Sequence, residues 1–120
     1  MKKIIVTGEN GVLGSSFKDI DFLKKNKKKY KFILINSKIV DLRNQKKTNE
    51  FIAQIKPHGI IHLAGSSGGL GRSSTNHASI FRDNLYMMLN ILEGARRSKV
   101  KKVVMTLSSG MYPKKSKLPY

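Results

Sequence analysis

Three glycines between a short apolar run and a helical pattern constrain the fold of this chain more than any other feature. Residues 4–6 predict a buried parallel strand, and Gly8, Gly11 and Gly14 follow it directly. Apolar residues at helical spacing come next, namely Leu13, Phe17, Ile20 and Leu23. In such a strand–turn–helix unit the glycines allow a tight turn, close approach of a pyrophosphate, and close packing of helix on strand. The segment therefore predicts a phosphate-binding turn at a helix N-terminus, with a ligand-free glycine-rich turn as the alternative.

Strand and helix patterns alternate along the rest of the chain. Apolar runs at 30–36, 59–64 and 102–107 predict strands, and residues 39–42 predict a further short extended piece. Asn44 can cap a helix that ends at Pro57, and a long helix is expected over residues 76–98. Its predicted buried stripe consists of Phe81, Leu85, Met88, Leu92 and Ala95. We expect one α/β domain over residues 1–120, a Rossmann-like parallel sheet of about five strands with helices on both faces.

Charge and composition exclude some functions and leave others open. The 24 Lys and Arg residues against 7 Asp and Glu give a net charge of +17, which attracts anions in general. The basic residues cluster where elements should end, and the aromatic residues are not interleaved with them, so nucleic-acid binding is not favoured. The sequence has no cysteine, which excludes disulfides and thiolate chemistry. With no secretory segment and no apolar run of membrane-spanning length, we expect a soluble, cytoplasmic protein.

The ends of the second and third predicted strands bear on ligand choice. Asn36, Ser37 and Lys38 follow the second strand with no acidic residue among them, which favours NADP over NAD, although Lys38 can equally be a solvated loop residue. The glycine- and serine-rich segment 65–74 is either a flexible linker or part of a site. The three histidines are too scattered for a metal site, and His62 is expected to be hydrogen-bonded at the end of its strand.

Several motifs, in order, resemble one known family. They are Thr7–Gly14 (T-G-x-x-G-x-x-G), Ile61–Gly65, Gly68–Leu70, Asp83–Leu85 and Ser108–Pro113. Together they are similar to the extended short-chain dehydrogenase/reductase (NAD-dependent epimerase/dehydratase) superfamily. Within it the chain looks most like the GDP-L-fucose synthases, which are NADPH-dependent 3,5-epimerase/4-reductases acting on GDP-4-keto-6-deoxymannose. The resemblance spans nearly the whole sequence.

The resemblance implies roles for particular residues. Ser108 falls where the family's catalytic Ser or Thr hydrogen-bonds the reacting oxygen while hydride arrives from the nicotinamide. Asn84 falls where the family's Asn braces the active-site strand. The residues expected to bind the cofactor are Thr7, Gly8, Asn10, Gly11, Val12, Leu13, Gly14, Ser37, Lys38, Asp41, Leu42, Leu63, Ala64, Gly65 and Asn84.

The chain also departs from the family pattern. Gly110 stands where the family has the cysteine that assists epimerisation. The family's general acid/base is a Tyr with a Lys four residues later, but Tyr112 is followed at that distance by Ser116, and Tyr120 is the final residue. We therefore expect the amino-terminal part of such an enzyme, inactive alone and able to act on a GDP-sugar only when completed.

Other functions remain open on the sequence. The chain can be a fragment of another nucleotide-sugar epimerase or dehydratase, or a non-catalytic module that binds a dinucleotide or a protein. Because the last predicted strand would leave an apolar sheet edge, we expect a homodimer or a complementing chain as partner.

Overall fold

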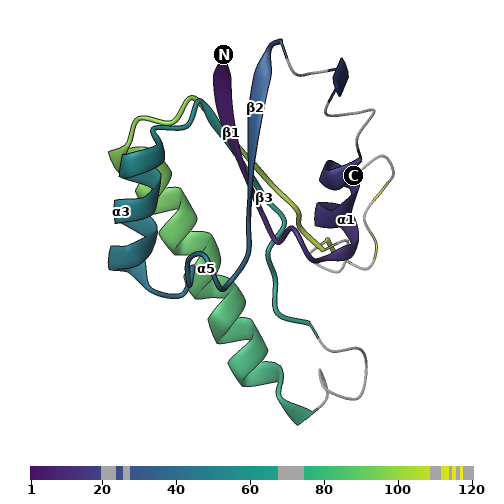
Figure 1. The fold of residues 1–120 in the computed structure, drawn as a ribbon. Helices are drawn as coiled ribbons and strands as arrows, with labels where there is room; N and C mark the ends of the chain where they lie inside the picture. Colours follow the sequence, from purple (N-terminus) through teal and green to yellow (C-terminus); the bar gives the residue numbers. More distant parts are fainter. Residues whose placement is uncertain are drawn as a thin grey trace.

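The protein forms a parallel β-sheet with helices packed beside it (Figure 1). The structure is a computed structural model that describes residues 1–19, 24–25, 28–67, 75–108, 112–113, 115 and 117. Within these residues the sheet has four strands in the order β2-β1-β3-β4. The strands are β1 (Lys2–Thr7), β2 (Tyr30–Ile35), β3 (Gly59–His62) and β4 (Lys102–Met105).

The register of the parallel strands aligns their carboxyl ends at one edge of the sheet. Thr7 lies opposite Ile35 on one side and opposite His62 on the other. His62 in turn lies opposite Met105. Because each strand is rich in β-branched and other apolar residues, the two inner strands are well suited to burial. The segments that leave β1, β2 and β3 therefore start at the same edge, where ligands bind in open α/β sheets.

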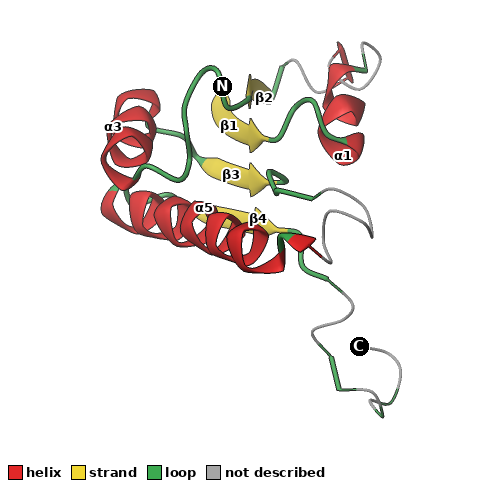
Figure 2. Ribbon diagram, turned by 90° about the horizontal axis from the view of Figure 1, so that it is seen from below, coloured by secondary structure: helices red, strands yellow, loops and turns green. Residues whose placement is uncertain are grey.

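Two helices lie side by side along one face of the sheet, and a shorter helical segment lies on the other side (Figure 1, Figure 2). The helix α3 (Gln45–Ile55) begins at Asn44, whose side chain accepts a hydrogen bond from the Lys47 N–H at 3.0 Å. The long helix α5 (His77–Arg97) packs against α3. On the opposite side, α1 (Val12–Ser15) continues into a 3-10 turn, η1 (Ser16–Lys18).

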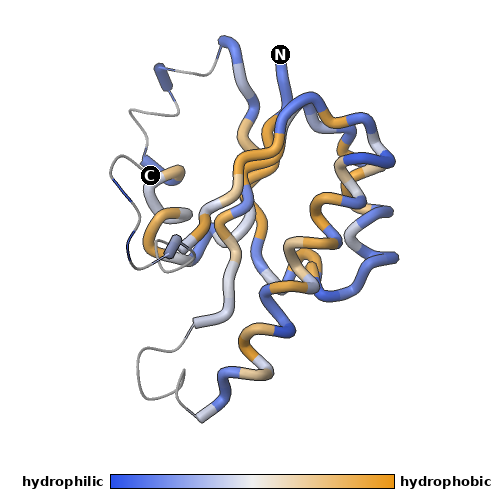
Figure 3. The backbone as a smooth tube through the Cα atoms, turned by 180° about the vertical axis from the view of Figure 1, so that it is seen from behind, coloured by the Kyte–Doolittle hydropathy of each residue, from blue (hydrophilic) through white to orange (hydrophobic). Residues whose placement is uncertain are grey.

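The core lies between the sheet and the α3–α5 pair. In Figure 3 the apolar stretches gather along the central strands and along parts of the two helices. The buried apolar residues of this core are Ile5, Ile35, Val40, Leu42, Ile52, Ile60, Ile91 and Ala95. The Rossmann-like α/β fold expected from the sequence is therefore confirmed.

The described part of the chain has four strands rather than about five, and residues 39–42, expected to form a short extended piece, belong to a turn and a loop. Asn36 nucleates a turn instead, because its side-chain oxygen accepts from the Lys38 N–H at 2.9 Å and its carbonyl accepts from Ile39 and Val40. Val40 and Leu42 still reach the core, but as parts of a loop rather than of the sheet.

The predicted buried stripe of the long helix is right only in part. Ala95 is buried and Leu85 and Met88 are partly buried, but Phe81 is 69% exposed and Leu92 is 43% exposed. The helix also buries Asn90 and Gly94, which were not predicted. A Cβ on Gly94 would lie 2.6 Å from Ile52 Cδ1, so this glycine permits the close approach of α5 to α3.

The first helix is also shorter than predicted. It has one α-helical turn before η1, and Asp19 is already extended. Leu13 is 57% exposed rather than buried, and Ile20 and Leu23 lie outside the described residues.

Candidate functional site

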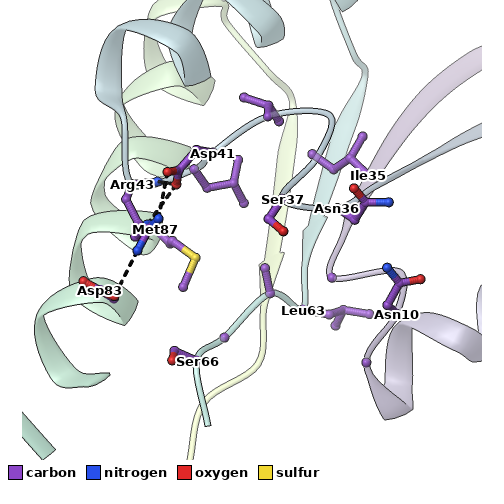
Figure 4. A pocket seen from close by; sticks show the side chains of 16 residues that line it. Asn10, Ile35, Asn36, Ser37, Asp41, Arg43, Leu63, Ser66, Asp83 and Met87 are labelled. Atoms are coloured by element: carbon purple, nitrogen blue, oxygen red, sulfur yellow. Dashed lines mark hydrogen bonds and ion pairs between the residues drawn. The ribbon is translucent and has the colours of Figure 1, made fainter. Parts of the chain in front are cut away.

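A cavity of about 460 Å³ opens at the carboxyl ends of the inner strands (Figure 4). Three segments line it: the glycine turn after β1, the segment after β2 and the loop after β3. Asp83 and Met87 of α5 complete its wall. Among the predicted cofactor residues, the cavity brings together Gly8, Asn10, Gly11, Ser37, Asp41, Leu42, Leu63, Ala64 and Gly65.

The glycine turn depends on missing side chains. Gly8 has a φ of 76°, and a Cβ there would lie 2.7 Å from the Ala64 nitrogen. A Cβ on Gly14 would lie 2.0 Å from the Gly8 carbonyl oxygen. Among the described residues, a Cβ on Gly11 would come close only to the Gly8 carbonyl oxygen, at 3.2 Å. Gly8 and Gly14 therefore allow the turn to pack, whereas Gly11 keeps the wall of the cavity free of a side chain.

Several backbone amides of this turn are already hydrogen-bonded within the protein. The Gly11 N–H donates to the Gly8 carbonyl at 2.9 Å, and Ser15 donates to the Gly11 carbonyl at 2.9 Å. Because α1 has a single turn, its macrodipole is small, and the N–H groups at its start would supply most of the attraction for an anion. The side chains of Val12 and Leu13 are exposed and do not line the cavity.

The segment after β2 presents Asn36 and Ser37 to the cavity (Figure 4). The Asn36 amide nitrogen donates to the carboxylate of Glu9 in the glycine turn. Lys38 is exposed and lies outside the lining of the cavity. Asn36 and Glu9 were not predicted as site residues, since their contact joins positions 27 residues apart.

An ion-pair cluster ties the segment after β2 to α5. The Arg43 guanidinium lies 2.9 Å from an Asp41 carboxylate oxygen and 3.3 Å from an Asp83 carboxylate oxygen (Figure 4). Hydrogen bonds from Arg43 hold the pKa of Asp41 below its usual value. The pKa of Asp83 is lowered first by a hydrogen bond from Arg82 and then by Arg43. Arg43 and Asp83 line the cavity but were missed, because nothing in their spacing indicates the contact.

Asn84, on α5, holds the loop after β3 in place through two hydrogen bonds. Its side-chain oxygen accepts from the Ser66 N–H at 2.6 Å, and its amide nitrogen donates to the Ser66 carbonyl at 3.0 Å. These two bonds fix the backbone of Ser66 on α5. Asn84 therefore holds a wall of the cavity in place without lining it, and Ser66 joins the lining.

Thr7 fastens the end of β1 to the loop after β3. Its hydroxyl oxygen accepts from the Leu63 N–H at 3.1 Å and from the Ala64 N–H at 3.0 Å. The same oxygen lies 2.8 Å from His62 Nδ1. With both lone pairs of the oxygen occupied, the hydroxyl proton points to Nδ1, so His62 has its own proton on Nε2. Burial lowers the pKa of His62 to about 4, which agrees with a neutral ring. The hydrogen-bonded histidine expected from the sequence is confirmed.

The predicted catalytic residue is not brought into the cavity. Ser108 follows β4 and is exposed, as is Tyr112. Residues 109–111, Ser116 and Tyr120, as well as the segment 68–74 and its Gly68–Leu70 motif, lie outside the described residues.

Neither a cluster of possible metal ligands nor a membrane-spanning helix occurs in the described ranges. In those ranges, no three acidic or histidine side chains come together in a group that could hold a metal ion. Nor does any helix there combine the length and the apolar character needed to cross a bilayer.

The parallel sheet and the glycine turn beside a cavity at its carboxyl edge define the Rossmann-like class of α/β fold. The chain belongs to the NAD dependent epimerase/dehydratase family, whose family model matches residues 4–120.

Named relatives within this family make nucleotide sugars. The chain is 33% identical over 119 residues to a probable GDP-L-fucose synthase of Drosophila melanogaster, covering 99% of this chain and 37% of the relative. It is 33% identical over 112 residues to the GDP-L-colitose synthase of Yersinia pseudotuberculosis, covering 93% and 35%. The structure of a GDP-L-fucose synthetase from Naegleria fowleri bound to NADP superposes with a TM-score of 0.79 at 30% identity, covering 99% and 34%. The chain thus spans about a third of the length of these relatives.

Replacing Thr7 with Val should destabilise the protein without changing its shape greatly. The substitution keeps the volume of the side chain but leaves the partly buried N–H groups of Leu63 and Ala64 without an acceptor. We expect a loss of about 2–4 kcal/mol in the free energy of unfolding, measured by urea denaturation. Thr7→Ser retains the hydroxyl and should lose clearly less. Equal losses for the two variants would contradict this account of the hydroxyl.

The stability of the protein should fall as the solution is acidified from pH 7 to pH 5. His62 has a pKa of about 4 in the folded chain and 6.5 when unfolded, so below pH 6.5 the unfolded state takes up the proton first. At pH 5 this linkage should remove about 2 kcal/mol of the free energy of unfolding relative to pH 7. His62→Asn should show a flatter profile over the same range, because Asn does not titrate. A wild-type profile no steeper than that of the variant would contradict the assignment.

Proposed function

We propose that this chain is the dinucleotide-binding part of a nucleotide-sugar epimerase/reductase, and that it binds NADP(H). The observation that supports this best is the glycine turn, which leaves the cavity wall beside Gly11 free of a side chain. A Cβ there would fill space that the pyrophosphate needs. Relatives named as GDP-sugar synthases, one of them with NADP bound in its structure, support the cofactor and the substrate class.

The cavity has room for the parts of a dinucleotide in a definite order. Its wall at Asn36, Asp41 and Leu42 suits the adenosine, because the end of the second strand faces the adenosine ribose in folds of this class. The glycine turn suits the pyrophosphate. The loop Leu63–Ser66 then suits the nicotinamide end, and Asn84 holds that loop in place.

The chemistry of the whole reaction is part of the proposal. A bound nicotinamide supplies hydride for reduction of a keto sugar. Ser108, just beyond the carboxyl end of β4, would donate a hydrogen bond to the keto oxygen of a GDP-sugar. This sequence contains no Tyr followed four residues later by Lys, so we propose that the general acid/base comes from residues outside it. Gly110, in place of the family's cysteine, leaves no thiol there to assist epimerisation.

A second candidate function follows from the absence of the Tyr and Lys pair in this sequence. A module that binds a dinucleotide without turning over a sugar would need the glycine turn but neither Tyr nor Lys. Its signature would be cofactor binding that no complementing polypeptide converts into activity.

The exposed apolar residues near the last strand support the proposal of a partner. Val104 is 44% exposed and Leu107 is 64% exposed. A groove lined by Ile4, Phe32, Ile61 and Val104, among others, lies on the sheet. We propose that a complementing chain or a second copy covers this face, since apolar patches of this kind mark interaction sites.

The lack of cysteine is consistent with a reducing, cytoplasmic location.

Titration of the 120-residue chain with NADPH tests the proposed function directly. We expect saturable binding in the micromolar range, followed by the fluorescence of the reduced nicotinamide. Gly11→Val should weaken it about a hundredfold or more, because the side chain enters the pyrophosphate space.

Ala53→Val is the control for this experiment. Ala53 is exposed on α3 and does not line the cavity, so binding should be retained. Circular dichroism checks that both variants are folded. Failure of the wild-type chain to bind NADPH, or unchanged binding by a folded Gly11→Val variant, would count against the proposal. Binding to arbitrary duplex DNA that falls steeply with salt would indicate a nucleic-acid function instead.

A further inference from the structure

The Glu9 carboxylate lies next to the end of β2, although the residues that directly follow β2 in the sequence are not acidic. Glu9, in the glycine turn, donates its backbone N–H to the Ile35 carbonyl at 3.3 Å and so lies directly beside the last residue of β2. Its carboxylate accepts a hydrogen bond from the Asn36 amide. The Glu9 side chain is only 16% exposed. A negative charge is therefore held beside Asn36, which lines a corner of the cavity (Figure 4), although Glu9 itself is not among the lining residues.

The Asn36 side chain is fixed in orientation by two hydrogen bonds. Its amide nitrogen donates to Glu9, and its oxygen accepts from the Lys38 N–H at 2.9 Å. Both polar atoms of the side chain thus have partners within the protein. A ligand at this corner would therefore meet an Asn36 side chain held in one orientation, with the Glu9 carboxylate hydrogen-bonded to it.

The cations near this corner compensate the charge of Glu9 only in part. The Lys18 ammonium lies 4.0 Å from the second Glu9 oxygen, but it also donates to Asn10 Oδ1 at 3.1 Å and is 47% exposed. Arg43 is engaged by Asp41 and Asp83. Lys38 is exposed and, like Glu9, is not among the residues that line the cavity. A second negative group brought next to Asn36 would therefore be repelled by a Glu9 charge that its neighbouring cations neutralise only in part.

We propose that Glu9 is a specificity-determining residue, whose charge beside Asn36 opposes the 2′-phosphate of NADP(H) but not the 2′-hydroxyl of NAD(H). The inference rests on the proposed dinucleotide binding. It adds that Glu9 limits how strongly the site prefers NADP(H) over NAD(H). In folds of this class an acidic side chain at the end of the second strand selects the 2′-hydroxyl, and a basic one accommodates the phosphate. Here the acid comes from the glycine turn and reaches the same corner through Asn36.

The test compares dissociation constants for NADH and NADPH in the wild-type chain and in Glu9→Gln. The Gln oxygen can still accept from Asn36, so the local geometry is kept while the charge is removed. We expect NADPH to bind about tenfold more tightly in Glu9→Gln, whereas the dissociation constant for NADH should change by less than about threefold. Added salt should reduce the effect on NADPH.

Glu50→Gln is the matched control, because it makes the same change in net charge on the exposed outer side of α3. It should leave the ratio of the two dissociation constants unchanged. Circular dichroism checks the fold, and Glu9→Ala serves as a second variant whose ratio should shift in the same direction.

The outcomes separate this inference from the proposed function. Binding of both cofactors with the same ratio in wild type and in the folded Glu9 variants overturns the role of Glu9 alone. An equal shift in Glu50→Gln also overturns it, since net charge would then explain the result. Absence of binding of either cofactor to wild type and variants overturns the dinucleotide site itself, and the role of Glu9 with it.

Discussion

Close backbone packing around the glycine turn is the constraint on which the rest of this structure depends. Gly8 lies against the backbone of Ala64, and Gly14 lies against the carbonyl of Gly8, with no space for a Cβ at either position. The Thr7 hydroxyl completes this junction by accepting the N–H groups of Leu63 and Ala64. The carboxyl ends of β1 and β3 are thereby held together, and the cavity opens where their loops separate.

The site follows from this junction and from charges placed around it. The glycine turn leaves an uncharged wall beside Gly11, suited to a group that needs close contact with backbone amides. Arg43 joins the segment after β2 to α5 through Asp41 and Asp83, and Asn84 fixes Ser66. Since the pairs of Arg43 are partly exposed, they contribute more to the shape of the rim than to stability.

The sequence allowed the fold class and the place of the site to be predicted, because both depend on local patterns. Apolar runs and the glycine spacing identify strands and turn before any contact is known. The remaining features depend on contacts between distant residues. On α5, Gly94 and Asn90 are buried beside apolar residues, because one allows close packing and the other donates to the Leu42 carbonyl. The Glu9–Asn36 contact and the role of Arg43 appear only once the strands are aligned.

Backbone amide spectra of a ¹⁵N-labelled chain, recorded by NMR during titration with NADPH, test the central claim most directly. If the glycine turn binds the pyrophosphate, the largest shifts should fall on the amides of Gly8–Gly14, with smaller ones in Leu63–Ser66. The contrary result would be an unchanged set of signals for the glycine turn while shifts are spread over the lysine-rich starts of the strands, around Lys28–Lys31 and Lys101–Lys102. That pattern would show a general attraction of anions to a strongly basic surface and no dinucleotide site.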